Sequence, residues 1–245
     1  MNLMILLTHL ILVFYVNIIQ AELFQTHVTD NYRIKYERNI SFDNIKMIGE
    51  VLESTNTAYQ KRLQLSQRRR IEVSIYKSVA RFRSDSKSLI FTDGIFQDGK
   101  IYLNVQDILR DEKRLQNVIA RVVTRALLAE VKDCPKWLAE AYSFYVGEEL
   151  ERFGQPSRLS VSSFRDLNED YSRSERRDDV KELYAKLAST IDFLISRYGE
   201  RKVDEIFKEF LKGYSYEEVF EAIFNDNLSD IEKAWLKSLS EPIRE

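Results

Sequence analysis

Two arginines, Arg121 and Arg125, lie four residues apart in the almost wholly apolar stretch VIARVVTRALL at positions 118–128. In a helix this spacing places both side chains on the same face. A helix that is apolar around nearly its whole circumference is normally buried, and arginine is seldom buried without a partner. We therefore expect both guanidinium groups to meet a carboxylate inside the fold, and Glu140 is the best candidate.

Glu140 belongs to the segment PKWLAEA at positions 135–141. Together the two segments resemble the active-site helices of the gluzincin metallopeptidases, the peptidase MA-like group, whose pattern reads roughly V-L-A-H-E-L-T-H-A-L-L and then P-x-W-L-x-E-G. By this resemblance Arg121 and Arg125 fall on the two zinc-binding histidines of the family, and Val122 falls on its general-base glutamate. Only Glu140 matches, as the third zinc ligand.

The substituted residues lack the chemistry of a gluzincin site, in which two neutral imidazoles and a carboxylate bind zinc and a glutamate takes a proton from the bound water. Arginine has no free lone pair at neutral pH, and a valine cannot exchange a proton. The two histidines of the chain, His9 and His27, both lie near the N-terminus, and no G-x-S-x-G motif is present. We expect no catalytic residue, no metal and no cofactor.

The sequence is compatible with three interpretations of Arg121 and Arg125. In the first, fixed guanidinium cations replace the charge of the metal and form a structural ion-pair cluster with Glu140. In the second, both arginines point into solvent on a less buried helix. In the third, the two convergent guanidinium groups bind an anionic ligand such as a peptide carboxylate.

The composition indicates one folded domain, which we place at positions 22–245. The chain has 245 residues, of which 44% are hydrophobic, so it is long and apolar enough for a substantial core. Its formal net charge is −2, which provides no overall field favouring nucleic acid or an anionic membrane. We expect a protein or peptide partner of unknown identity and no nucleic acid.

Residues 1–21 carry no charged side chain, are rich in Leu, Ile, Val and Phe, and end in a small residue, Ala21. This pattern is typical of a secretory signal peptide. An uncleaved membrane anchor is the alternative, because the apolar run is close to the roughly 20 residues that span a bilayer. Either way we expect an extracytoplasmic protein, secreted or periplasmic and possibly tethered to the membrane through this segment.

Apolar periodicity predicts a small sheet followed by helices. After an irregular lead over residues 22–30, strands are expected at 32–36, 71–76, 89–96 and 101–104, with helices at 41–63 and 78–83. Helices starting near Asp111 and Pro135 follow, and Asp133 and Cys134 are expected to cap the second. A polar, mobile surface connection is expected over residues 154–179, and four helices after it, at 183–199, 203–213, 216–224 and 228–239.

The resemblance extends to residues 184–199, 213–220 and 231–235, so that it covers roughly residues 71–239. It implies an α+β, zincin-like fold with a small N-terminal mixed sheet, two central helices and a helical C-terminal lobe. The leading hypothesis is a catalytically inactive peptidase-like domain that acts as an extracytoplasmic binding or scaffold module. The alternatives are a hydrolase with an unrecognised non-zinc site and a membrane-anchored structural envelope protein.

Overall fold

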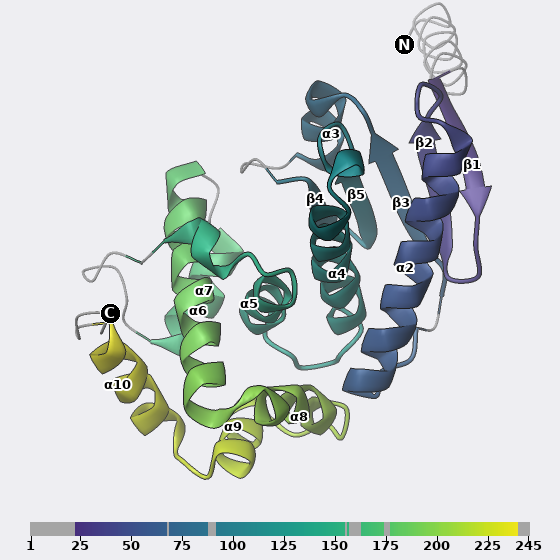
Figure 1. Ribbon diagram of the computed structural model, residues 1–245. Coiled ribbons are helices and arrows are strands. Elements are labelled where there is room, and N and C mark those ends of the chain that lie inside the picture. Colours follow the sequence, from purple (N-terminus) through teal and green to yellow (C-terminus); the bar gives the residue numbers. More distant parts are fainter. Residues whose placement is uncertain are drawn as a thin grey trace, which may run out of the picture.

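The computed structural model describes residues 23–67, 69–87, 92–154, 156, 163–173 and 177–239. Its architecture is α+β, with the sheet in the N-terminal half and a helical C-terminal half (Figure 1). The expected signal segment at 1–21 and residues 89–91 of the expected strand lie outside the described residues.

The described strands form one mixed sheet in the order β1-β2-β3-β5-β4. The three inner strands run parallel, and each edge strand runs antiparallel to its neighbour. The expectation of an irregular lead over residues 22–30 is wrong, because residues 24–28 pair along β2. The strands are β1 (Phe24–Val28), β2 (Tyr32–Glu37), β3 (Ile71–Tyr76), β4 (Gly94–Gln97) and β5 (Lys100–Asn104).

Two long helices, α2 (Phe42–Leu63) and α4 (Glu112–Leu128), pack against the sheet and against each other. Each starts at a capping side chain: Ser41 Oγ accepts a hydrogen bond from Asn44 N at 3.4 Å, and Asp111 Oδ1 accepts one from Arg114 N at 3.0 Å. Their apolar faces form one core with the inward residues of β2, β3 and β5. The short helix expected over residues 78–83 is α3 (Val79–Ser86), which packs against β3 and β5.

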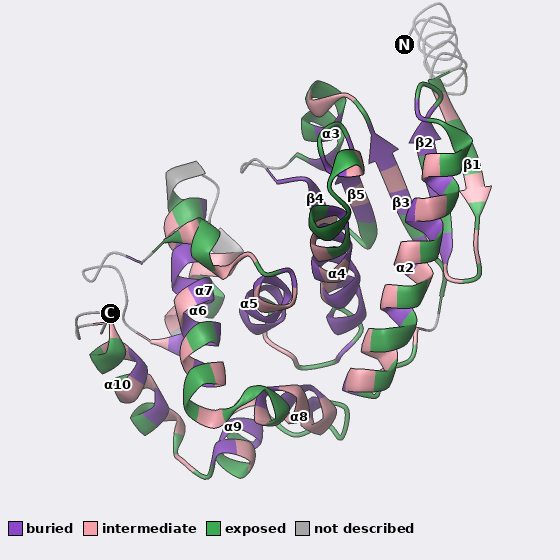
Figure 2. Ribbon diagram, in the orientation of Figure 1, coloured by how far each residue is buried: buried purple, intermediate pink, exposed green. Residues whose placement is uncertain are grey.

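A second core lies among the helices of the C-terminal half and is centred on large aromatic side chains, including Trp137, Phe207, Phe220 and Trp235. The two cores meet where α4 packs against α5, and both helices are largely buried in Figure 2. The helices are α5 (Lys136–Val146), α6 (Phe164–Arg173), α7 (Arg177–Tyr198), α8 (Glu200–Phe210), α9 (Tyr216–Phe224) and α10 (Leu228–Ser238). Short 3₁₀ turns, η1 (Ile108–Arg110) and η2 (Leu150–Phe153), follow β5 and α5.

The expected surface connection over residues 154–179 is wrong in part, because α6 lies within it. Phe164 and Leu167 of α6 are buried, and the Phe164 ring stacks on Trp137 with ring centroids 5.5 Å apart. Most residues of this segment are polar, but its apolar residues recur at helical spacing. Such spacing is enough to bury one side of a helix.

The expected capping of α5 by Asp133 or Cys134 is also wrong. Pro135 is the N-cap residue, and no side-chain cap bond is formed. Asp133 instead turns the chain with a φ of 63°, a conformation that aspartate tolerates better than most residues. The thiol of Cys134 donates to the carbonyl oxygen of Pro135 at 3.7 Å.

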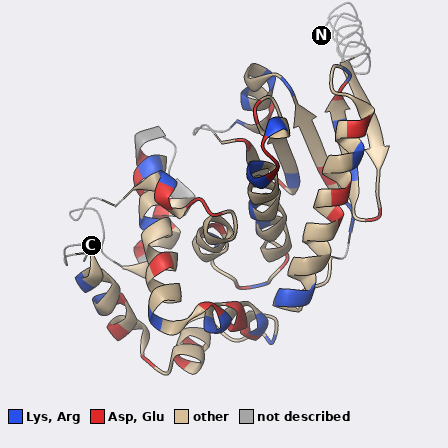
Figure 3. Ribbon diagram, viewed as in Figure 1, with Lys and Arg blue, Asp and Glu red and all other residues tan. Residues whose placement is uncertain are grey.

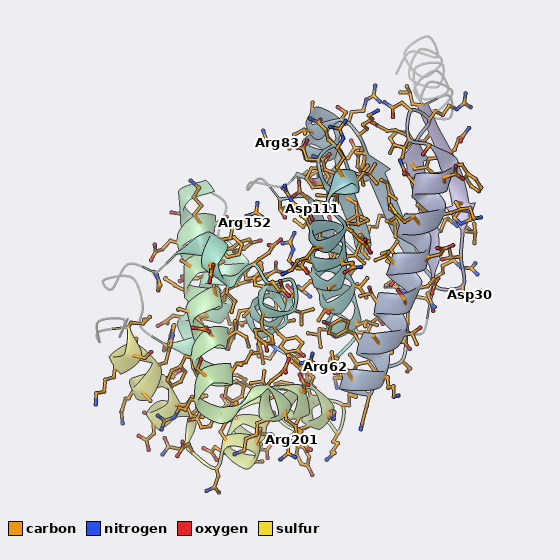
Figure 4. All side chains as sticks on the ribbon, viewed as in Figure 1. Asp30, Arg62, Arg83, Asp111, Arg152 and Arg201 are labelled. Carbon is orange, nitrogen blue, oxygen red and sulfur yellow. The ribbon has the colours of Figure 1, made fainter. Side chains whose placement is uncertain are left out.

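An ionic contact at the C-terminal end of α2 joins the sheet-containing half to the helical half. Arg62 donates to both carboxylate oxygens of Asp204 on α8, at 2.9 and 3.0 Å, and also contacts Glu200. Tyr142 of α5 donates its hydroxyl to the same Asp204 carboxylate. Figure 4 labels Arg62 where α2 approaches α8. Burial opposes the charge of Arg62, but these acceptors outweigh it, so the pKa of the guanidinium is raised above its ordinary value.

We predict that Asp204→Ala lowers the free energy of unfolding by about 2 kcal/mol, because it leaves Arg62 and the Tyr142 hydroxyl without their shared acceptor. Glu205→Ala, one residue further along α8, is the control. Glu205 lies 3.8 Å from the exposed Arg201, and such surface pairs contribute less than about 0.5 kcal/mol. Urea unfolding of both variants checks this, and equal shifts in their midpoints would contradict the bridging role of Asp204.

Candidate functional site: a buried arginine–glutamate cluster

The helix pair α4 and α5 carries the arginines and the glutamate singled out by the sequence. The side chains of Arg121, Arg125 and Glu140 are only 4%, 12% and 9% exposed. Glu140 lies on α5 between buried neighbours, as its place beside Trp137 and Phe144 predicts. The interpretation that both arginines point into solvent is therefore wrong.

Arg125 and Glu140 form the expected ion pair. Arg125 Nε donates to Glu140 Oε2 at 2.8 Å, and the guanidinium carbon lies 6.0 Å from the centre of the Phe96 ring on β4. Burial disfavours the charge of Arg125, but the nearby Glu140 carboxylate more than offsets it, and the pKa of the guanidinium is raised. The guanidinium therefore stays charged beside the carboxylate.

Tyr171 of α6 completes this pair. Its hydroxyl donates to Glu140 Oε2 at 3.2 Å and accepts from Arg125 Nη2 at 3.4 Å. Burial, together with the negative charge of Glu140, raises the pKa of Tyr171 to about 12, so its hydroxyl stays protonated at neutral pH. The sequence analysis missed Tyr171, although its spacing from Phe164 and Leu167 on one helix face could have indicated that it points inward.

Arg121 does not contact Glu140, contrary to the expectation that both arginines share this carboxylate. Its Nη2 donates to the hydroxyl of Thr92 and to the carbonyl oxygen of Gly94. Its Nε lies 3.5 Å from Glu149 Oε2, just beyond the end of α5. Arg121 therefore joins α4 to the start of β4 on one side and to the α5–η2 connection on the other.

The Gly94 carbonyl that Arg121 contacts lies on the outer edge of the sheet. Asn104 N donates to Asp93 O at 2.7 Å, and Gly94 follows Asp93 in the antiparallel register of β4 and β5. Because bonding groups alternate along an antiparallel pair, the backbone groups of Gly94 point away from β5. Arg121 thus occupies a buried hydrogen-bonding position on the outer side of this edge strand, away from β5.

Two glycines let the chain approach Arg121 and Val122 this closely. A Cβ on Gly94 would lie 2.8 Å from Val118 Cγ1 and 3.0 Å from Val122 Cγ1, so β4 and α4 meet where only glycine fits. A Cβ on Gly147, at the end of α5, would lie 2.9 Å from Arg121 Cβ. Val122, which the resemblance aligns with a general-base glutamate, is 1% exposed and packs against β4 as an ordinary core residue.

Three further side chains near the cluster, Trp137, Tyr184 and Cys134, contribute to packing. Trp137 is 1% exposed within the helical core. Tyr184 packs on Phe144 and Phe153, with ring centroids 4.8 and 5.3 Å apart, and burial raises the pKa of its hydroxyl well above its ordinary value. Burial also raises the pKa of the Cys134 thiol to about 12, which leaves almost no reactive thiolate at neutral pH.

A cavity of about 420 Å³ lies beside the Arg121 end of the cluster and is lined in part by Asp93, Arg114, Gly147 and Glu149. Its charges are paired internally, since Arg114 Nε donates to Asp93 Oδ2 at 3.0 Å and Glu149 approaches Arg121. Arg121 Nη2 and the Nε and Nη2 atoms of Arg125 likewise donate to protein acceptors, although the buried Arg121 Nε and Glu149 Oε2 make no hydrogen bond. This pairing favours the structural ion-pair interpretation over capture of an anion.

The described part of the chain contains no group of three His, Cys, Asp or Glu side chains arranged to hold a metal ion. His27 lies on β1 against the Phe42 ring, with ring centroids 5.4 Å apart. No helix within the described ranges is long and apolar enough to cross a membrane. No protein-family model and no curated protein matches the chain.

We predict that Glu140→Ala lowers the free energy of unfolding by about 3 kcal/mol or more, because it leaves the buried Arg125 guanidinium without its carboxylate. Glu221→Ala, on the exposed side of α9, should change it by less than about 0.5 kcal/mol. The midpoints of denaturant unfolding provide the measurement. A midpoint shift for Glu140→Ala no larger than that for Glu221→Ala would show that the Arg125–Glu140 pair is solvated.

Proposed function

We propose that this chain is a catalytically inactive, gluzincin-like domain of the peptidase MA-like type that acts as an extracytoplasmic binding or scaffold module. The α+β architecture, with two central helices behind a small mixed sheet, is compatible with this assignment. The observation that carries the proposal is the buried Arg125–Glu140 pair, with 2.8 Å between Arg125 Nε and Glu140 Oε2.

The pair has a direct interpretation in terms of charge. In the resembled family a zinc dication faces the glutamate that corresponds to Glu140, and in this chain the guanidinium of Arg125 faces it instead. A carboxylate buried between two helices needs a cation, and arginine supplies one that cannot lose its proton at neutral pH. The substitution thus keeps the helix pair electrostatically balanced without a metal.

The side chains around Glu140 support a role without catalysis. A general acid or base must exchange a proton near neutral pH, and Val122 has no proton to exchange. Burial raises the pKa of Tyr171 to about 12 and raises that of Tyr184 well above its ordinary value. On the sheet side, Arg121 bonds the outward carbonyl of Gly94, an acceptor that an added peptide strand would otherwise use.

Restoring the family motif tests the proposal. We predict that Arg121→His, Val122→Glu and Arg125→His together give a folded protein that binds about one zinc ion, because Glu140 is already placed opposite position 125. The same triple variant with Glu140→Ala is the matched control and should bind zinc at least tenfold more weakly. Isothermal titration with zinc, with circular dichroism to verify folding, provides the measurement.

A folded triple variant without zinc affinity would mean that Glu140 is not placed as a third ligand, and the gluzincin assignment would fail. The unmodified protein, prepared without chelators, should contain no stoichiometric zinc and should leave casein and peptide substrates uncleaved. One zinc per chain with chelator-sensitive cleavage would overturn the inactive assignment. Cleavage that chelators do not affect would favour the hydrolase alternative.

A further inference from the structure

β1 is an edge strand of the described sheet, and its own residues lack the usual protection against pairing. Its sequence, FQTHV, contains no Lys, Arg, Asp, Glu or Pro, and Figure 3 shows the strand free of charged residues. Natural edge strands are normally blocked by charges, proline, bulges or a covering element, because their free backbone groups can pair with another chain. Val28 is 49% exposed, and no further described strand lies beyond β1 in the sheet order.

The register of β1 with β2 shows which backbone groups are free. Arg38 N donates to Leu23 O and Thr29 N donates to Tyr32 O, each at 3.0 Å, so the odd-numbered residues of this segment bond to β2. Because the bonding direction alternates along an antiparallel pair, Phe24, Thr26 and Val28 direct their N–H and C=O groups outward. Three outward-facing residues are therefore centred on Thr26.

The side-chain pattern of β1 is complementary to itself about the same residue. In an antiparallel pairing of two copies centred on Thr26, the two Thr26 residues face each other, a pair that can hydrogen-bond. Phe24 then faces Val28 of the second copy, which is a favourable aromatic–β-branched pair. Gln25 faces His27 of the second copy, so an amide meets an imidazole and no like charges are brought together.

We propose that two copies of this chain associate through antiparallel pairing of β1 with β1, centred on Thr26, and form one continuous sheet across a two-fold axis. All three outward-facing residues then find backbone partners in the second copy. The nearby cations, Arg33 and Lys35, lie on β2 rather than at the edge, and the Lys35 ammonium is already placed 4.7 Å from the centre of the Phe24 ring. Solvent and salt screen their repulsion across the axis.

This contact concerns a different surface from the arginine–glutamate cluster and stands independently of the proposed function. The exposed Phe42, at the start of α2, packs beside His27 and adds apolar surface next to the strand. A five-residue strand pair is nevertheless smaller than the interface of a stable dimer, which buries about 1,200 Å² or more. We therefore expect a dimer that dissociates on dilution.

Light scattering coupled to size-exclusion chromatography, over a wide range of protein concentrations, tests the proposal. The protein should pass from monomer to dimer as concentration rises. Thr26→Pro removes the outward N–H at the centre of the pairing while leaving the β1–β2 bonds intact, and should weaken dimerisation at least tenfold. Thr26→Val keeps this N–H and serves as the matched control, with dimerisation retained.

Cross-linking gives a second measurement in case Thr26→Pro disturbs folding. Facing residues of a hydrogen-bonded antiparallel pair have Cα atoms about 5.5 Å apart, within the range that a disulfide spans. With an added oxidant, Thr26→Cys should therefore form a disulfide-linked dimer, whereas Thr57→Cys, on the exposed side of α2, should not. A protein that stays monomeric at every concentration would overturn the proposal. So would equal cross-linking of the two cysteine variants, or a folded Thr26→Pro protein that dimerises like the original.

Discussion

The contact between α4 and α5 depends on one buried charge pair, Arg125 with Glu140. Such a pair adds little net stability compared with apolar residues of similar volume, but removing one member leaves an uncompensated ion in a medium of low polarity. The two residues therefore depend on each other. Tyr171 and Arg121 extend the cluster to α6 and β4, and the close approach at Gly94 and Gly147 holds the sheet and both helices around it.

The sequence predicts the Arg125–Glu140 pair of this site. The four-residue spacing of the arginines, on a helix too apolar to be exposed, indicates buried guanidinium groups, and Glu140 is the nearest carboxylate on an inward helix face. The partners of Arg121 could not be inferred in the same way. Thr92 and Glu149 lie 29 and 28 residues from Arg121 in the sequence. The third partner is the backbone carbonyl of Gly94, and no residue type indicates that a backbone carbonyl will accept such a bond. Only the folded arrangement brings these groups together.

The fold shows a similar division between local and long-range information. Strands with clean alternation, such as residues 71–76, and helices with strong apolar periodicity were predictable because their pattern reports burial directly. Residues 24–28 have no such pattern, since an edge strand is specified by its pairing with β2. α6 was missed because its polar residues dominate the composition, although Phe164 and Leu167 anchor it in the core.

A double-mutant cycle on Arg125 and Glu140 is the most direct test of whether a fixed cation balances this carboxylate. The unfolding free energies of Arg125→Met, Glu140→Leu and the double variant would be measured in urea. Each single variant should lose stability, and the double variant should recover much of that loss, giving a coupling energy of about 2 kcal/mol or more. If the two single-variant losses sum to the loss of the double variant within about 0.5 kcal/mol, the two residues act independently. That result would contradict the account.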